Sequence, residues 1–447
     1  MSKIGYIERD NMQYPVFYGC FEKKWAWKRD GWIGDTSIIS ENIFEYAYAV
    51  DEKNTLLESL SGTKYFKQYI THTYARELES SWLIEGEKLD SIQLRSILVK
   101  KLGLSLPEWS VRRQHLRDDK ENAAVEAALT LINSKDSLSS KQICSIHKML
   151  EKGDSGSVDG EFGSLRTSPE YVLRFRNTYY EIIYEAPPAN DVQELIDKYT
   201  DWWKQSKEAN LPRTLGAALC HLYFVEIHPF HDGNGRMSRL LMDKYMCPSS
   251  EDSFRPYSIQ ASIRTHRTDS EITINEESVT TGISYPKYYN GKQIHPNTLR
   301  EPLLPYFCIS KQILGKPSTY YQSLDEYSSN YNINNFLKYI ISLQENAIEG
   351  ALRRVPLLYS LGENFDKYHK YLSDDEMLII RNAVLSDGVT SDISELTADI
   401  LDEEKGIFLC ENLIKAGIIS LYKTKVMLND DTIEKLSEIK GRAENDK

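Results

Sequence analysis

Hydrophobic residues recur at three- and four-residue spacings over most of the chain, which is the spacing that places side chains on one face of an α-helix. The pattern begins near residue 41 and is clear at Leu56, Leu57 and Leu60. A helix over 74–85 is predicted to end at Gly86, because glycine readily adopts the backbone conformation that closes a helix. Further helices are predicted over 90–101, 119–134, 141–151, 190–203, 211–227, 236–246, 376–385, 393–401 and 404–416, with several more between 303 and 361. Their predicted N-terminal caps are Asp90, Ser139 with Gln142, and Asn190 with Gln193.

β-Structure is predicted in a few short stretches. Residues 171–173 and 182–184 are apolar and flank a polar stretch, which indicates a β-hairpin that ends at Pro187-Pro188. A strand pair over 418–428 follows the last three helices, and this order is typical of a winged helix-turn-helix. The aromatic residues before residue 50, Trp25, Trp27 and Trp32 among them, are expected to pack in a core with short strands or turns around them.

The size of the chain, 447 residues, predicts two to four domains. Its 54 basic and 66 acidic residues give a net charge of −12, which argues against nucleic acid or an anionic membrane as a partner of the whole chain. The six cysteines are scattered without metal-ligand spacing, as expected for buried thiols in a reducing compartment. No signal peptide and no membrane-spanning run is visible, so a soluble, cytoplasmic protein is expected.

One segment concentrates the chemistry: His228-Pro-Phe230-His-Asp232-Gly-Asn-Gly-Arg236-Met-Ser-Arg239. Its two glycines place a sharp turn between two apolar helices, and the amides at the start of the second helix form an anion site. Arg236 and Arg239 share one side of the first turn, which suits a polyphosphate better than a lone phosphate. Asp232 supplies the single carboxylate that a nucleotide-bound Mg²⁺ commonly uses. His228, at the end of the first helix, is suited to act as a general base, so the segment predicts attack by a hydroxyl on a phosphoryl group.

This segment resembles the signature HxFx(D/E)GNGRxxR of the Fic family at every fixed position. The resemblance implies an enzyme, a protein adenylyltransferase that uses ATP and Mg²⁺ to place AMP on a Ser, Thr or Tyr hydroxyl of a target protein and on itself. It implies His228 as the catalytic base, Asp232 as the metal ligand and Phe230 as the structural anchor of the loop. By the same resemblance, the nucleotide-binding residues are Gly233, Asn234, Gly235, Arg236 and Arg239, and Arg239 would bind the γ-phosphate.

A second stretch, Ser81-Trp-Leu-Ile-Glu85-Gly86, resembles the family's inhibitory pattern (S/T)xxxE(G/N). Ser81 and Glu85 lie four residues apart and therefore on one helical face. By resemblance, Glu85 is expected to pair with Arg239 and to hold ATP in an unproductive pose, so that the enzyme is autoinhibited. The hairpin at 171–184 resembles the family's flap, on which a target protein docks as an added strand.

The predicted fold class is therefore mainly α, with a Fic helical core, a β-hairpin flap, a helical N-terminal region and a C-terminal winged helix-turn-helix. The predicted organisation is an N-terminal region over 1–105 with an inhibitory helix at about 70–86, a catalytic core over 106–250, an insertion over 251–305, a helical linker over 306–372 and a winged-helix domain over 373–447.

Two alternatives use the same residues. The site could instead remove AMP or transfer another nucleotide or phosphate-linked group. The winged helix could make the chain a DNA-binding transcriptional regulator with a Fic sensor core. Residues 375–447 contain nine Lys or Arg against sixteen Asp or Glu, a net of −7, which favours a protein-contact or homodimer module over a DNA reader.

Overall fold

A computed structural model describes residues 3–420 of the chain, except for 10–11, 19–24, 61–65, 104–118, 135–137, 152–161, 210, 248–287, 290–291, 294–303, 387–392, 398–399 and 401. Most of these residues are helical, which confirms the predicted mainly α fold. Among them no helix is both long and apolar enough to cross a membrane.

The helices fall into three groups along the chain. The first group is α1 (Glu41–Ser59), α2 (Phe66–Ile84), α3 (Ser91–Lys101), α4 (Asp119–Ile132) and α5 (Ser140–Glu151). The second is α6 (Val192–Glu208), α7 (Arg213–Ile227) and α8 (Asn234–Met246). The third is α9 (Ile309–Gly315), α10 (Pro317–Asn330), α11 (Ile333–Glu363), α12 (Phe365–Tyr368), α13 (Asp374–Leu385), α14 (Ile393–Thr397) and α15 (Glu403–Lys415). Two 3₁₀ turns, Ala26–Lys28 and Ala189–Asp191, complete the set in the described residues.

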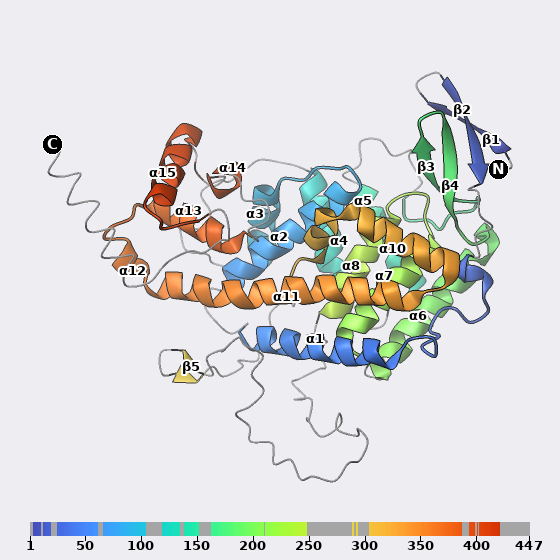
Figure 1. Cartoon of the computed structure of the whole chain (residues 1–447), viewed down its shortest axis with the longest axis horizontal. Helices are drawn as coiled ribbons and strands as arrows, with labels where there is room; N and C mark the ends of the chain where they lie inside the picture. The colour runs from blue at the N-terminus through green and yellow to red at the C-terminus, as the bar shows by residue number, and fades with distance from the viewer. Residues whose placement is uncertain are drawn as a thin grey trace, which may run out of the picture.

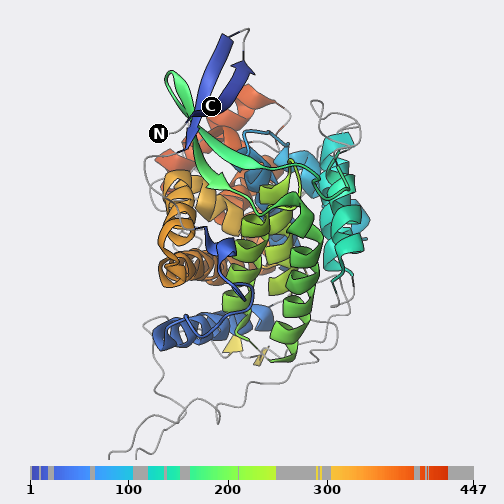
Figure 2. The same ribbon diagram turned by 90° about the vertical axis from the view of Figure 1, so that its right-hand side faces the viewer.

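A four-stranded sheet stands at one end of the helical body, and α13–α15 lie at the other end (Figure 1). Its strands are β1 (Lys3–Arg9), β2 (Met12–Tyr18), β3 (Tyr171–Arg176) and β4 (Tyr179–Glu185), in the order β1-β2-β4-β3. The predicted hairpin is β3–β4. The N-terminal hairpin β1–β2 adds to it, because β2 runs parallel to β4 and pairs with it over 16–18 and 180–182. Figure 2, which faces this end, shows the two hairpins side by side.

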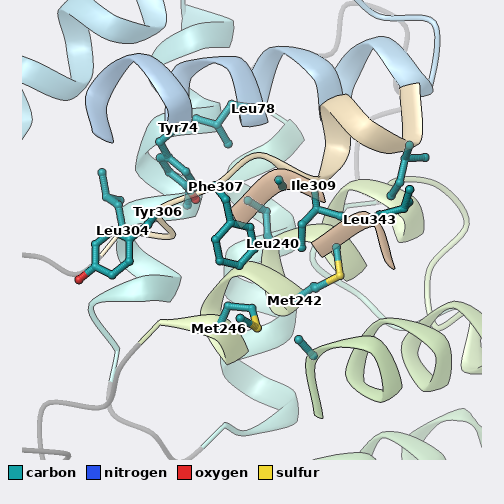
Figure 3. Packing of buried hydrophobic residues seen from close by; sticks show 14 of the residues in the cluster. Tyr74, Leu78, Leu240, Met242, Met246, Leu304, Tyr306, Phe307, Ile309 and Leu343 are labelled. Atoms are coloured by element: carbon teal, nitrogen blue, oxygen red, sulfur yellow. The ribbon is translucent and has the colours of Figure 1, made fainter. Parts of the chain in front are cut away.

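The core is centred on α7 and α8, whose side chains are almost all buried. The long helix α11 runs along the body beside α1 (Figure 1), where Lys53 makes ion pairs with Glu345 and Glu349. On another side, α2 and the start of α9 pack against α8. Figure 3 shows this contact, in which the buried side chains are Tyr74, Leu78, Leu240, Met242, Met246, Tyr306, Phe307 and Ile309. The helix predicted to be inhibitory is thus part of the main core.

Helix ends were predicted well where a strong local signal exists. Asp90 accepts hydrogen bonds from the amides of Ile92 and Gln93 and caps α3, as predicted. Asn190 was predicted to cap the helix through Trp203, and this is wrong: residues 189–191 form a 3₁₀ turn and α6 begins at Val192 without a side-chain cap. The helix predicted from Arg236 begins two residues earlier, at Asn234.

The C-terminal region contains the three predicted helices α13, α14 and α15. The predicted strand pair falls almost entirely after residue 420, outside the described residues, so the winged helix stays a prediction. Most of the predicted insertion at 251–305 also lies outside them, except for the short strand pair β5 (Tyr288–Tyr289) and β6 (Lys292–Gln293) and residues 304–305.

Candidate active site

The segment 228–239 forms the turn between α7 and α8. His228 ends α7 in the left-handed conformation with φ of 49°, and Gly233 precedes α8 with φ of 76°. The first backbone hydrogen bond of α8 joins the Met237 amide to the Gly233 carbonyl. A helix has no internal acceptor for its earliest amides, so the start of α8 presents donors and the positive end of the helix dipole.

Asn234 closes this turn from within. Its Oδ1 accepts the Phe230 amide at 3.0 Å, and its Nδ2 donates to the Phe230 carbonyl at 2.8 Å. The Phe230 side chain is fully buried between the helices. The Asn234 side chain is therefore occupied by the backbone of the loop, and only its main chain remains to face a ligand.

His147, on α5, supports the turn from below. Its ring stacks on Phe230 with centroids 3.6 Å apart and on Phe162 with centroids 4.6 Å apart. The Gly163 amide donates to Nδ1, so the proton lies on Nε2, which donates to the Asp232 carbonyl at 2.9 Å. Burial lowers the pKa of His147 to about 4, which keeps the ring neutral. Nothing in the local sequence pattern indicates that His147 holds the motif.

Arg166 is the second support that sequence reasoning missed. Its buried guanidinium group donates to four carbonyls, those of Ser168, Pro187, Ile227 and His228, at 2.6–3.5 Å. Two of these end α7 and two flank the β3–β4 hairpin. A cation at this position satisfies carbonyls that the helix end leaves without donors. No local pattern marks Arg166 in the sequence.

The His228 ring is oriented for proton transfer at Nε2. Its Nδ1 lies 3.3 Å from the Val225 carbonyl, an acceptor, so Nδ1 carries the proton and the lone pair is on Nε2. Burial lowers the pKa of His228 below its usual 6.5, which favours this neutral form. The neighbouring His231 points elsewhere: its Nδ1 lies 2.8 Å from the Glu170 carboxylate, just before β3.

Arg239 is held by the C-terminal end of α2. Its Nε donates to Ser81 Oγ at 2.8 Å, and its Nη2 donates to the Ser81 carbonyl and to Glu85 Oε1, both at 2.7 Å. Burial by itself would lower the pKa of Arg239, but the Glu85 carboxylate raises it. A Cβ added at Gly235 would collide with Glu85 Oε1, so the carboxylate lies directly against the first turn of α8. The structure thus brings together Ser81, Glu85 and Arg239 as the sequence predicted.

Arg236 also contacts two carboxylates. Its Nη2 donates to Asp232 Oδ2 at 2.8 Å, and its Nη1 lies 3.0 Å from Glu87 Oε1. The contact with Glu87 was not predicted. The Asp232 side chain is 61% exposed, at the mouth of the turn. Among the described residues no group of three or more potential metal ligands gathers anywhere.

The β3–β4 hairpin is attached next to this turn. The Tyr184 hydroxyl donates to the Glu226 carbonyl at the end of α7, and the Tyr184 ring lies 6.3 Å from the His228 ring, between centroids. The indoles of Trp25 and Trp27 donate to the Glu185 side chain and carbonyl at 2.9 and 2.7 Å. The hairpin is therefore fixed at its base on both sides of the site.

Comparison with known proteins matches this site to one family. Residues 137–246 match the model of the Fic/DOC family. Protein adenylyltransferase Fic of Aedes aegypti is 32% identical over 197 residues, which are 43% of this chain and 36% of the relative. Protein adenylyltransferase fic-1 of Caenorhabditis elegans is 30% identical over 204 residues, 44% and 35% of the two chains. This chain thus spans just over a third of the length of these curated relatives.

Solved structures of Fic proteins overlap with the chain more loosely. A Fic family protein from Desulfovibrio desulfuricans matches with a TM-score of 0.43 at 17% identity, over 80% of this chain and 82% of that chain. Fic-1 of C. elegans, residues 134–508, matches with a TM-score of 0.43 at 18% identity, over 71% of this chain and 74% of that chain.

Proposed function

We propose that the chain is an autoinhibited protein adenylyltransferase, which transfers AMP from ATP to a Ser, Thr or Tyr hydroxyl of a target protein and to itself. The observation that carries the proposal is the arrangement at the start of α8. A histidine with a free Nε2 lies next to helix-end amides and two buried arginines, Arg236 and Arg239. Relatives that share this domain are named protein adenylyltransferases.

In the proposed reaction the amides of the 233–235 segment and the two arginines bind the polyphosphate of ATP. His228 Nε2 accepts the proton of the target hydroxyl as its oxygen attacks the α-phosphorus. The bond from that phosphorus to the bridging oxygen breaks, and pyrophosphate leaves. AMP remains on the target oxygen as a phosphodiester.

The residues present fit a Mg²⁺ ion that arrives with the nucleotide. Asp232 offers one exposed carboxylate, and magnesium bound to phosphates needs only one or two from the protein. The ion would neutralise phosphate charge. Asp232 would hold it after exchanging part of its contact with Arg236.

The restraint on this enzyme is the pair between Glu85 and Arg239. Arg239 donates from Nε and Nη2 to Ser81 and Glu85, so a γ-phosphate competes with a carboxylate for the same guanidinium group. We propose that removing the Glu85 carboxylate releases Arg239 and allows ATP to bind in the reactive pose.

The target would dock on the β3–β4 flap. β3 is the outer strand of the sheet on one side, and its backbone can accept an added strand. The start of β3 is tied to the motif through the contact between Glu170 and His231, which keeps the docking edge near His228.

ATP labelled at the α- or the γ-phosphate tests this function. In a Glu85→Gly variant, α-label should accumulate on the protein and γ-label should not. A Glu85→Gly/His228→Ala variant should lose the α-label while it still binds ATP. Incorporation of γ-label would instead indicate phosphoryl transfer, and loss of label from previously adenylylated protein in the unmodified chain would favour removal of AMP. No label in any variant, with sequence-specific DNA binding, would favour the regulator alternative.

A further inference from the structure

The segment after α2 brings a second carboxylate to the site, that of Glu87. Its Oε1 lies 3.0 Å from Arg236 Nη1, while the other side of the same guanidinium group is bound to Asp232. The Arg236 side chain is only 2% exposed, and it also lies over the rings of Trp82 and Phe162, about 6 Å from each centroid. At such a buried site an opposite charge interacts more strongly than on the surface.

The position of Glu87 is fixed by the way α2 ends. The Gly86 amide donates to the Leu83 carbonyl, and the Glu87 amide donates to the Trp82 carbonyl. Gly86 has φ of 82°, so these bonds form a Schellman motif, a common closure of helices. The motif fixes the backbone on both sides of Gly86, which sends Glu85 to Arg239 and Glu87 to Arg236. Lys120, on α4, binds the other oxygen of Glu87 at 2.5 Å and holds it in place.

We infer that Glu87 is a positioning residue that holds Arg236 away from the nucleotide, so that one helix end restrains both arginines of the site. The inference rests on the proposed function, since it assumes that Arg236 binds a phosphate. Two arginines face three carboxylates here, those of Asp232, Glu85 and Glu87. A polyphosphate must therefore displace carboxylates from both guanidinium groups.

The two restraints act on different parts of the nucleotide. Glu85 occupies Arg239, which is proposed to bind the γ-phosphate. Glu87 occupies Arg236, which lies three residues earlier and closer to the helix-end amides, and we assign Arg236 to the inner phosphates. ADP has no γ-phosphate, so its affinity should respond to Glu87 and be nearly indifferent to Glu85.

Titration calorimetry with Mg²⁺ and ADP tests this assignment on the full chain. Glu87→Gln keeps the size of the side chain and removes its charge, and it should tighten ADP binding by roughly tenfold. Glu85→Gln should leave ADP affinity within about twofold of the unmodified chain. Glu126→Gln is a matched control, because Glu126 makes a similar ion pair with Lys101 away from the site. The Glu126→Gln variant should bind ADP with the same affinity as the unmodified chain.

The inference is overturned if Glu87→Gln leaves ADP affinity unchanged, weakens it, or shows no ADP binding. A merely structural role for Glu87 would lower the melting temperature and weaken ADP binding together, which thermal denaturation of the same variants would show. Failure of the proposed function is seen separately. In that case Glu85→Gly incorporates no AMP from ATP, whatever Glu87→Gln does to ADP affinity.

Discussion

At the scale of single residues, the proposed role of His228 as a base requires that its ring be neutral. The Val225 carbonyl orients the proton at Nδ1, and burial lowers the pKa below 6.5. A base with a lowered pKa remains unprotonated to a lower pH than a free histidine does. The acid limb of the pH dependence of AMP transfer by Glu85→Gly should therefore have its midpoint below 6.5. Initial rates between pH 5 and pH 8 measure it. A midpoint at or above 6.5 would contradict the assigned environment of His228.

Glu226, two residues before His228, is a buried carboxyl group that the proposed reaction does not use. Burial raises its pKa to about 7, although the Ser328 hydroxyl donates to it and opposes the rise. A carboxyl whose pKa is raised by folding stabilises the folded state while it is protonated, below about pH 4.5. That stability is lost as pH rises through 7, and the loss amounts to about 3 kcal/mol.

Glu226→Gln should remove this dependence, because glutamine keeps the acceptor for Ser328 and has no charge. The free energy of unfolding of the variant, relative to that of the unmodified chain, should increase by about 2.5 kcal/mol between pH 5 and pH 8. Urea denaturation at both values measures the difference. If the free energies of unfolding of the variant and the unmodified chain differed by the same amount at both pH values, the Glu226 carboxyl would not be protonated in the folded protein.

Residues of the motif could be predicted because their chemistry is compressed into twelve consecutive positions. Ser81 and Glu85 could be predicted because a second short pattern marks them. Arg166, His147 and Glu87 could not, since their roles depend on which segments meet in space. A lone arginine, histidine or glutamate carries no local sign of the carbonyl or guanidinium group that it will meet.

At the scale of elements, the flap is part of a larger sheet than the sequence indicated. The β3–β4 hairpin has a local signature of two apolar runs around a polar turn. The pairing of β2 with β4 joins segments more than 160 residues apart and has no such signature. Aromatic contacts between Tyr14 and both Phe175 and Tyr180 reinforce it. Helix ends show a similar division: Asp90 and Gly86 act locally and were predicted, whereas a 3₁₀ turn over 189–191 takes the place of the predicted cap at Asn190.

Removing residues 1–18 should loosen the flap. A two-stranded hairpin is only marginally stable, and the deletion exposes the outer edge of β4. Hydrogen exchange of backbone amides in 179–185 should become roughly tenfold faster, while amides of α7 should keep their protection. Unchanged exchange in β4 would show that the N-terminal hairpin does not stabilise the flap.

At the scale of the whole molecule, the helix that we propose to be inhibitory is part of the core. Glu77, two turns before Glu85 on α2, accepts hydrogen bonds from the amide and the hydroxyl of Ser310 at the start of α9. The same face of α2 packs on α8 (Figure 3). The end of α2 therefore cannot leave the site without disturbing contacts to the C-terminal half of the chain.

Global charge and local charge point to different partners. The net charge of −12 disfavours the binding of long polyanions. It does not reveal the compact site with its two buried arginines. We propose that at this site the contact of Glu85 with Arg239 keeps a competent adenylyltransferase inactive.

The most direct measurement of this claim is the initial rate of AMP incorporation at saturating ATP, compared between the unmodified chain and Glu85→Gly by intact-protein mass spectrometry. We expect a rate at least about tenfold higher in the variant, with no such gain in the control Glu126→Gln. An equal or lower rate in Glu85→Gly would contradict it, because Arg239 would then not be the group that the inhibitory helix withholds from ATP.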